Sequence, residues 1–242
     1  LTIPEPFSKN IFKKNDIWSF NEKNLNKLIK KYSLFKYGFY EPHELNKKNL
    51  QYNFHGGAEW MGASIDHDNQ VMYVTANNIP YETEIVKNNF SESEIPKYES
   101  KFKRALDEYG YPISKPPWGT LTALNLNTGK IIWQIPFGEF PGLKEIGIEI
   151  TGTENFGGVT STAGNISIAT GALDKKIYVF DSSNGEIIYK ETLPFIGSSP
   201  PSTYLYKDEQ FIIVHSSGGK SLQDGYPNLV TTGNKIIAFK LK

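Results

Sequence analysis

The residue types best suited to bind a ligand lie in short segments that contain paired glycines. In residues 56–60 (Gly-Gly-Ala-Glu-Trp), the carboxylate of Glu59 and the indole of Trp60 follow two glycines and precede a strand-like run. A carboxylate can hydrogen-bond a polar ligand, and an indole can form an apolar wall beside it. A packing tryptophan beside a solvated glutamate is the structural alternative.

Two further segments carry the same kind of signal. Asn155 and Phe156 precede Gly157 and Gly158, and two glycines allow backbone N–H groups to approach a carboxylate closely. A glycine turn between strands explains this segment equally well. In residues 219–220 (Gly-Lys), the ammonium of Lys220 follows an apolar run and can pair with a carboxylate.

Other kinds of reactive site find little support in the sequence. Zinc-binding spacing is absent from the four histidines, and His55 is close to the Gly-Gly-Ala-Glu-Trp segment. The chain has no cysteine, which excludes a disulfide scaffold, a thiolate zinc site and a cysteine nucleophile. It also contains no nucleophile elbow, P-loop or G-x-G-x-x-G motif.

Composition excludes two further classes of protein. The 26 basic and 26 acidic side chains balance, and Arg104 is the single arginine, so a nucleic-acid-binding surface is not expected. No run approaches the roughly 18 apolar residues that a membrane-spanning helix needs. The 21 glycines, 14 prolines and 14% aromatic residues favour many short strands joined by turns.

An internal repeat indicates how these strands are organised. Residues 121–133 (LTALNLNTGKIIW) align without gaps on residues 177–189 (IYVFDSSNGEIIY), and residues 235–241 form a third, truncated copy. Each full copy is typical of a strand, a tight turn ending in glycine, and a second strand ending in an aromatic residue. We expect this aromatic residue to cover the packing between neighbouring units.

The elements around the repeat complete the sequence-based prediction. Residues 63–66 and 71–74 form a predicted hairpin, and strand pairs are expected at 163–170 and at 201–206 with 210–216. Helical spacing predicts helices over 21–33 and 93–109, the second within a long excursion at 80–118. Four short strands per roughly 50 residues predict an all-β fold over residues 1–242: a partial β-propeller of about four blades with short helical insertions.

The sequence resembles a known family at four places in order. These are residues 56–66 (GGAEWMGASID), 116–123 (PPWGTLTA), 152–164 (beginning GTENFGG) and 218–241 (from GGK to IIAFKL). Together with the repeat around Trp133, they are similar to the C-terminal half of pyrroloquinoline quinone (PQQ)-dependent dehydrogenases, in the membrane-type glucose and quinate/shikimate dehydrogenase branch. Those enzymes are eight-bladed propellers, so the resemblance implies that the N-terminal half of the propeller is missing here.

The resemblance also implies an activity. The whole enzyme is expected to oxidise a hydroxyl of a sugar, polyol or alcohol with PQQ, and to pass electrons to ubiquinone or a cytochrome. The calcium or magnesium ligands and the catalytic base are expected upstream, so no catalytic or metal-binding residue is assigned in this fragment, which alone is expected to be inactive. The cofactor-pocket residues that the resemblance implies are Glu59, Trp60, Asn155, Phe156, Gly157, Gly158, Gly219 and Lys220.

The resemblance further implies a periplasmic location, with an inner-membrane anchor in the absent N-terminal region. A non-catalytic periplasmic propeller scaffold of the outer-membrane assembly type is the alternative from another functional class. It needs the docking aromatic residues, but it needs no polar, glycine-flanked inner edge. The segments at 56–60 and 152–158 therefore favour the enzyme.

Overall fold

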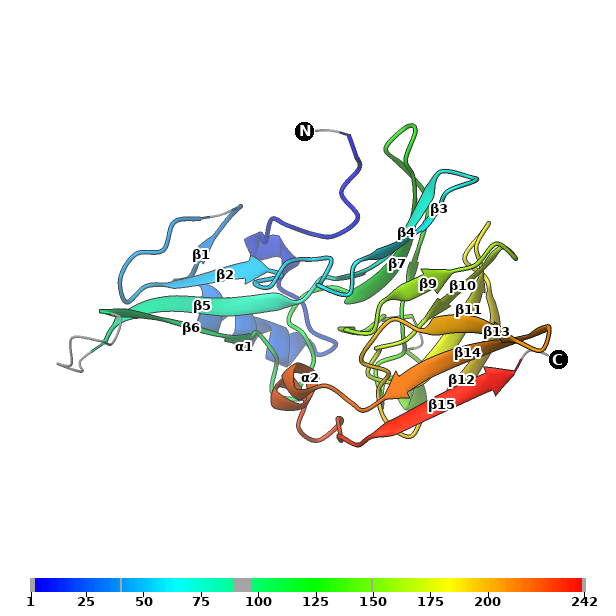
Figure 1. Ribbon diagram of the computed structural model, residues 1–242. Coiled ribbons are helices and arrows are strands. Elements are labelled where there is room, and N and C mark those ends of the chain that lie inside the picture. Colours follow the sequence, from blue (N-terminus) through cyan, green and yellow to red (C-terminus); the bar gives the residue numbers. More distant parts are fainter. Residues whose placement is uncertain (1–2, 40, 89–96, 149, 241–242) are drawn as a thin grey trace. The chain divides into compact units, whose positions relative to one another are not determined.

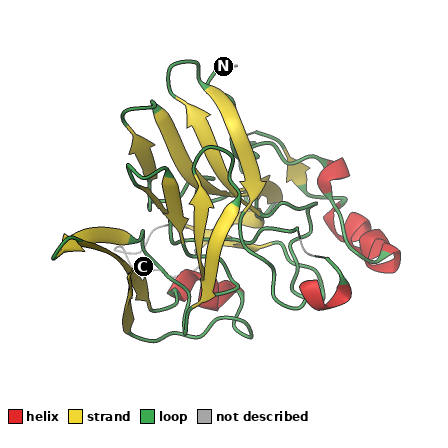
Figure 2. Ribbon diagram, turned by 90° about the vertical axis from the view of Figure 1, so that its right-hand side faces the viewer, coloured by secondary structure: helices red, strands yellow, loops and turns green. Residues whose placement is uncertain are grey.

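A computed structural model describes residues 3–39, 41–88, 97–148 and 150–240 (Figure 1). The chain forms two compact units. Unit 1 comprises residues 1–8, 58–77 and 116–242, and unit 2 comprises residues 9–57 and 78–115. Strands make up most of the regular secondary structure (Figure 2). Within the described residues they form four sheets, three with four strands and one with three. The predicted all-β partial propeller is thereby confirmed.

Three of the sheets lie in unit 1 and are named here the first, second and third blades. The first blade consists of β3 (Ala63–Asp66), β4 (Val71–Asn77), β7 (Gly119–Asn125) and β8 (Lys130–Pro136). The second consists of β9 (Val159–Ser161), β10 (Ile166–Ala169), β11 (Lys176–Asp181) and β12 (Ile187–Thr192). The third consists of β13 (Ser202–Tyr206), β14 (Glu209–Ser216) and β15 (Lys235–Lys240). All neighbouring strands within these blades pair antiparallel.

The internal repeat corresponds to the outer hairpins of the first two blades. Gly129 and Gly185 end the two turns with φ values of 67° and 78°, a left-handed conformation that glycine adopts without steric cost. Both hairpins shift register at the same place, between Ala123 and Leu124 in one and between Val179 and Phe180 in the other. The gapless alignment of the two copies therefore reflects one repeated structure, including its β-bulge.

The first two blades share a buried hydrophobic core. Alternate residues of their strands point into it, as the two-residue period of a strand requires. The buried members are Val71, Tyr73, Leu121, Ala123, Phe137, Val159, Ala169, Ala172, Tyr178 and Phe180. Trp133, the aromatic residue that ends the first copy of the repeat, packs against this core and donates a hydrogen bond from Nε1 to the carbonyl of Ser182 at 3.0 Å. The prediction that this aromatic residue covers the packing between neighbouring blades is confirmed for Trp133, whereas its counterpart Tyr189 in the second copy is 46% exposed.

The long connection predicted at 80–118 lies between β4 and β7 of the first blade, and its residues 78–115 belong to unit 2. The sheet of unit 2 has the strand order β1 (Lys36–Tyr37), β2 (Lys48–Tyr52), β5 (Pro80–Lys87) and β6 (Tyr98–Arg104). Its β1 and β2 pair parallel, whereas β2, β5 and β6 pair antiparallel. Its strand order is sequential, as in the blades, but the parallel pair β1–β2 distinguishes it from the fully antiparallel blades.

The helix predicted over 21–33 is confirmed as α1 (Glu22–Tyr32). The side chain of Asn21 caps it by accepting hydrogen bonds from the backbone N–H groups of Lys23 and Asn24. Its apolar face, which includes Leu28 and Tyr32, is buried in the core of unit 2. The remaining helical elements are η1 (Lys14–Asp16), η2 (Lys144–Ile146) and α2 (Lys220–Gly225).

The helix predicted over 93–109 is wrong where the structure describes it. Residues 98–104 form the edge strand β6, paired with β5 from Tyr81 opposite Arg104 to Lys87 opposite Tyr98. Residues 93–96 lie outside the described part. Tyr98 and Phe102 share a face at a spacing of four residues, and that spacing fits a strand as well as a helix.

Candidate functional site

Two of the predicted site segments lie at equivalent places in unit 1. Glu59 and Trp60 come shortly before β3, the first strand of the first blade, and residues 155–158 come directly before β9, the first strand of the second blade. The two strands are side by side, since the hydroxyls of Ser64 and Ser161 are 2.6 Å apart and Ser161 donates its backbone N–H to Ser64 Oγ at 2.8 Å. The fold therefore brings these segments to the same end of neighbouring blades.

Gly158 is the point at which the segments meet. It has a φ of +77°, and a Cβ atom placed on it would lie 2.9 Å from Cβ of Met61 and 3.0 Å from Cγ of Pro200. Met61 follows Trp60 directly, and Pro200 lies just before β13 of the third blade. The segments that lead into all three blades therefore converge on this glycine, which any side chain would crowd.

Gly157 is required for a different reason. A Cβ atom at this position would lie 2.3 Å from the carbonyl carbon and oxygen of Thr170 and 2.5 Å from the nitrogen of Gly171. The N–H of Phe156 donates to the carbonyl of Gly171 at 3.3 Å, and the N–H of Thr170 donates to the carbonyl of Gly158 at 3.3 Å. The glycines thus allow two backbone segments of the second blade to touch.

Asn155 holds this segment against the first blade. Its backbone N–H donates to Oδ1 of Asn77 at 2.9 Å, and Asn77 Nδ2 returns a bond to the Asn155 carbonyl at 3.0 Å. The Asn155 amide nitrogen adds a third bond to Asn77 Oδ1 at 3.0 Å. Both residues are buried, with exposed fractions of 1% and 2%. The Asn155 amide nitrogen is therefore already paired within the fold.

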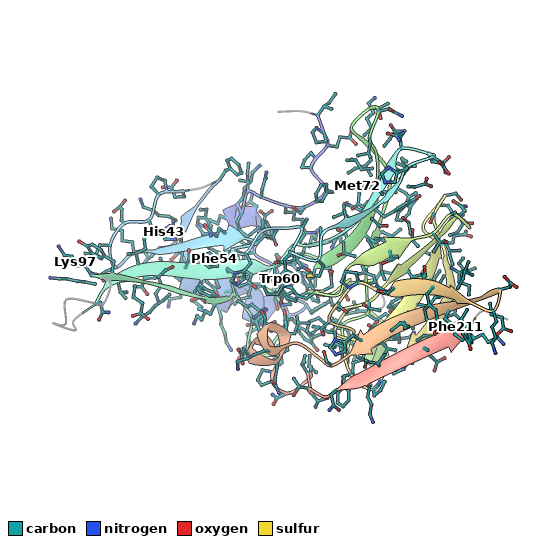
Figure 3. All side chains as sticks on the ribbon, viewed as in Figure 1. His43, Phe54, Trp60, Met72, Lys97 and Phe211 are labelled. Atoms are coloured by element: carbon teal, nitrogen blue, oxygen red, sulfur yellow. The ribbon has the colours of Figure 1, made fainter. Side chains whose placement is uncertain are left out.

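The side chains that remain accessible are those of Trp60, Glu59 and Phe156. The indole of Trp60 is 86% exposed, an unusual state for so large an apolar group (Figure 3). Glu59 and Phe156 are half-buried. The segment that meets Gly158 through Met61 thus carries an exposed apolar ring at Trp60 and, one residue earlier in the chain, the carboxylate of Glu59.

The third predicted segment has a different setting. Gly219 is the extended residue before α2, and a side chain there would meet no atom within 4 Å. The side chain of Lys220 is 85% exposed, and its ammonium lies 3.3 Å from Asp224 Oδ1, one helical turn further on. Lys220 is thus a surface residue that forms an i,i+4 ion pair, a contact that contributes little to stability.

Two residues of this region were not found by sequence reasoning. Asn77 ends β4 and forms the reciprocal bonds to Asn155, but its partner lies 78 residues away and no local pattern indicates it. Glu154 is only 1% exposed, which is rare for a carboxylate and was not foreseen for a residue in a loop.

The described residues contain no cluster of three His, Asp or Glu side chains arranged to hold a metal ion. None of the helices within the described ranges is long and apolar enough to cross a bilayer.

Comparison with known proteins identifies the family. The model of the glucose/ethanol/alcohol dehydrogenase β-propeller domain, a PQQ family, matches residues 2–212. The chain belongs to this PQQ dehydrogenase β-propeller family. Three of its four ordered motifs and both full copies of its repeat fall within the matched range, and the fourth motif, residues 218–241, lies beyond it.

Relatives of the PQQ propeller family agree with this assignment. Quinate/shikimate dehydrogenase (quinone) of Acinetobacter baylyi is 24% identical over 213 residues, which are 77% of this chain and 26% of that protein. Quinoprotein glucose dehydrogenase of Escherichia coli is 26% identical over 211 residues, again 77% of this chain and 26% of that protein. The chain therefore spans about a quarter of the length of these relatives.

Solved structures show the same fold. A quinohemoprotein alcohol dehydrogenase of Pseudomonas putida HK5 superposes with a TM-score of 0.58 at 18% identity, covering 81% of this chain and 28% of that one. A europium-containing methanol dehydrogenase gives the same TM-score at 19% identity, covering 78% of this chain and 34% of that one. The chain thus has the fold of part of a PQQ dehydrogenase propeller.

Proposed function

We propose that this chain forms part of the cofactor pocket of a PQQ-dependent dehydrogenase that oxidises a hydroxyl group of a sugar, polyol or alcohol. The observation that carries the proposal is the convergence at Gly158 of the segments that lead into the three blades, one of which carries Glu59 and the 86% exposed Trp60 directly before Met61. The membership of the propeller family, and relatives named as quinate and glucose dehydrogenases, support the reaction class.

The accessible groups fit this cofactor in their chemistry. PQQ is a planar ring system with three carboxylates and quinone oxygens. An exposed indole offers a stacking surface for a planar ring, and a glycine-rich backbone permits a close approach. Glu59 can accept a hydrogen bond from a ring N–H or donate one when it is protonated. Trp60, Glu59, Phe156 and Gly158 would therefore form the contacts.

The other predicted residues have supporting places in this proposal. Asn155 and Gly157 would position the backbone of Phe156 and Gly158, because their own contacts lie within the fold. Gly219 and Lys220 would lie at the rim, where a lysine can attract a carboxylate of substrate or cofactor.

The redox chemistry is supplied by the bound quinone, which accepts two electrons and the substrate hydrogen. The residues of this chain contribute binding and orientation, and they exclude water from one side of the ring. The catalytic base and the calcium or magnesium ligands would lie in the part of the protein that precedes these residues. In the proposed whole enzyme the electrons pass to ubiquinone or a cytochrome on the periplasmic side of the inner membrane.

The test is to express the longest reading frame that contains these residues, and to titrate it with PQQ in the presence of calcium. Dye-linked oxidation of sugars, polyols, cyclitol acids and simple alcohols is then measured. We expect activity that requires PQQ and falls at least tenfold in Trp60→Ala and Glu59→Gln. Tyr206→Ala is the matched control, because Tyr206 is another exposed aromatic residue of unit 1, 57% exposed on β13.

A folded protein that oxidises none of these substrates with PQQ would contradict the proposal. Equal losses in Trp60→Ala and Tyr206→Ala would contradict the role of Trp60 in particular.

A further inference from the structure

One face of the unit 2 sheet, the face on which α1 packs, is apolar at one end and charged at the other (Figure 1). At the apolar end its residues are buried in the core of unit 2 together with Leu28 and Tyr32 of α1: Leu50, Tyr52 and Ala105. Further along the same three strands, the alternate residues that share this face are charged: Lys48 on β2, Glu82 and Glu84 on β5, and Lys101 and Lys103 on β6.

A pocket of about 190 Å³ opens at the charged end of this face. The five charged residues line it, together with Thr83 and Phe102. They form two rows across the strands. Glu84 lies directly opposite both Lys48 and Lys101, and Glu82 lies directly opposite Lys103.

In the row nearer to α1, the carboxylate is already paired. Glu82 accepts a hydrogen bond from the ammonium of Lys31 at 2.9 Å, and its other oxygen lies 3.3 Å from the ammonium of Lys103. The negative charge of Glu82 is therefore balanced within the fold.

In the outer row, the two lysines are not paired with the carboxylate between them. Residues directly opposite each other in neighbouring strands are close enough for such a pair. The described residues nevertheless contain no ion pair between Glu84 and either Lys48 or Lys101. The ammonium of Lys48 instead lies 6.0 Å from the centroid of the Phe35 ring. Two ammonium groups at the pocket thus have no anionic partner in the described part of the chain.

The pocket therefore has an excess of positive charge. Four ammonium groups, including that of Lys31, surround two carboxylates, so two positive charges are not balanced. Unit 2 as a whole has the same sign, with 16 basic and 11 acidic side chains, whereas unit 1 has 10 basic and 15 acidic. A field of this sign raises the local concentration of anions.

We propose that this pocket binds the phosphate group of a phosphate monoester. At neutral pH such a group carries a charge of about −1.5 to −2, which matches the excess positive charge of the pocket. Its oxygens accept hydrogen bonds from ammonium groups, and lysine is a common phosphate-binding residue. Lys48 and Lys101 would supply the direct contacts, and Lys103 would add a third beside Glu82. A carboxylate carries a single charge and would leave the pocket unbalanced.

This inference is independent of the proposed function, because all of its residues belong to unit 2 and none belongs to the predicted cofactor pocket. A soluble phosphate monoester and the head group of phosphatidic acid offer the same chemistry, and the test distinguishes these two sources.

Isothermal titration calorimetry with glycerol phosphate as the probe tests the proposal on the longest reading frame that contains these residues. We expect saturable binding that is at least tenfold weaker in the double variant Lys48→Gln, Lys101→Gln. The double variant Lys23→Gln, Lys30→Gln is the matched control, with an expected loss of less than twofold. It removes two exposed lysines of the same unit that do not line the pocket, and it changes the net charge equally.

Glu84→Gln gives a change of the opposite sign. It removes a negative charge from the pocket, so it should strengthen binding of glycerol phosphate about twofold to threefold. A variant that acted only by disturbing the fold would weaken binding instead, and weaker binding in this variant would contradict the proposal.

Co-flotation with vesicles of phosphatidylcholine and phosphatidic acid distinguishes the two sources. Flotation that is lost in the Lys48, Lys101 variant would support the lipid head group, and calorimetric binding without flotation would support a soluble ester. The proposal would be overturned if neither probe bound to the folded protein, or if the two double variants lost binding equally. Binding of acetate as tight as that of glycerol phosphate would also overturn it.

Discussion

Different interactions stabilise the interior of each of the two units of this chain. Unit 1 is a repeat of blades whose backbones touch through glycines and whose junction is covered by Trp133. Unit 2 has no such repeat, and charged and aromatic side chains connect its helix to its sheet. The difference indicates that a side chain added at the blade glycines is poorly tolerated, whereas in unit 2 a buried carboxylate and its lysine partners act in addition to an apolar core.

Glu82 is the centre of the polar contacts in unit 2. It is 5% exposed on β5 and accepts hydrogen bonds from the Tyr32 hydroxyl at 2.6 Å and the Lys31 ammonium at 2.9 Å. Lys103 lies 3.3 Å from its other oxygen. Burial alone would raise the pKa of Glu82, but the bonds from Tyr32 and Lys31 outweigh burial and lower it. Glu82 is therefore charged at neutral pH.

The largest effect is expected from a methyl group at Gly157. Gly157→Ala should lower the free energy of unfolding by about 3 kcal/mol, because its Cβ would lie 2.3 Å from the Thr170 backbone, which cannot rotate away. Chemical denaturation measures this loss, and hydrogen exchange should locate it in unit 1. Gly164→Ala is the control, since Gly164 does not have a left-handed φ and a Cβ there would meet only Thr162 Oγ1, at 3.6 Å. Equal losses in both variants would contradict the steric explanation.

The next prediction compares Trp133, which covers the junction of the first two blades, with Tyr189, its counterpart in the second copy of the repeat. Trp133→Ala should cost about 2–3 kcal/mol, because it removes a packed ring and a hydrogen bond from the junction of the first two blades. In the 242-residue chain, Tyr189→Ala should cost less than about 1 kcal/mol, since Tyr189 is 46% exposed at an apolar groove between the second and third blades. Thermal unfolding of both variants measures the two losses of stability. Similar losses would contradict the comparison, because they would show that Tyr189 is packed as tightly as Trp133.

A smaller effect is expected in unit 2. Glu82→Gln should destabilise this unit by about 2 kcal/mol, because it removes the charge that pairs with two lysines in a buried site. Hydrogen exchange of peptides from α1 and β5 measures the effect. Glu84→Gln, two residues along the same strand and half-exposed, should change it by less than about 0.5 kcal/mol. If loss of Glu82 instead raised exchange mainly in the blades, the contrast between the units would be wrong.

The smallest effect concerns a charged cluster in unit 1. Glu139 lies 2.7 Å from Lys176 and 3.0 Å from Lys190. Burial would raise the pKa of Glu139, but the hydrogen bonds from both lysines prevail and lower it from 4.5 to about 2. A carboxyl group whose pKa is lowered by folding stabilises the fold at pH values above its ordinary pKa of 4.5. This contribution is lost as the pH falls toward 2.

Glu139→Gln should therefore cost about 1 kcal/mol at pH 7, and the difference from the unsubstituted protein should shrink between pH 4.5 and 2. Urea denaturation across this range measures it. A difference that stays constant with pH would show that the Glu139 charge does not contribute.

The sequence was sufficient to predict the features that repeat or are local. The repeat predicted the outer hairpins, the turn glycines Gly129 and Gly185, and the covering role of Trp133. The cap at Asn21 and the apolar spacing behind it predicted α1. These features depend on residues a few positions apart, so their physical causes are visible in a short window.

Features that depend on distant partners were not predictable in the same way. The parallel pairing of β1 with β2 and the reciprocal bonds between Asn77 and Asn155 join segments that no local pattern connects. The strand β6 was missed because a spacing of four residues fits both regular structures. In the candidate site, sequence indicated the glycines as possible ligand contacts, whereas packing alone explains why Gly157 is glycine.

Direct binding of PQQ is the measurement that tests the central claim, that Trp60 and its neighbours form a wall of the cofactor pocket. The longest reading frame is titrated with PQQ and calcium while tryptophan fluorescence is recorded, and the dissociation constant is confirmed by calorimetry. We predict saturable quenching that is reduced in Trp60→Phe, with affinity at least tenfold weaker in Trp60→Ala than in Tyr206→Ala. Binding with the same affinity in both alanine variants, or no binding at micromolar PQQ to the folded protein, would contradict the account.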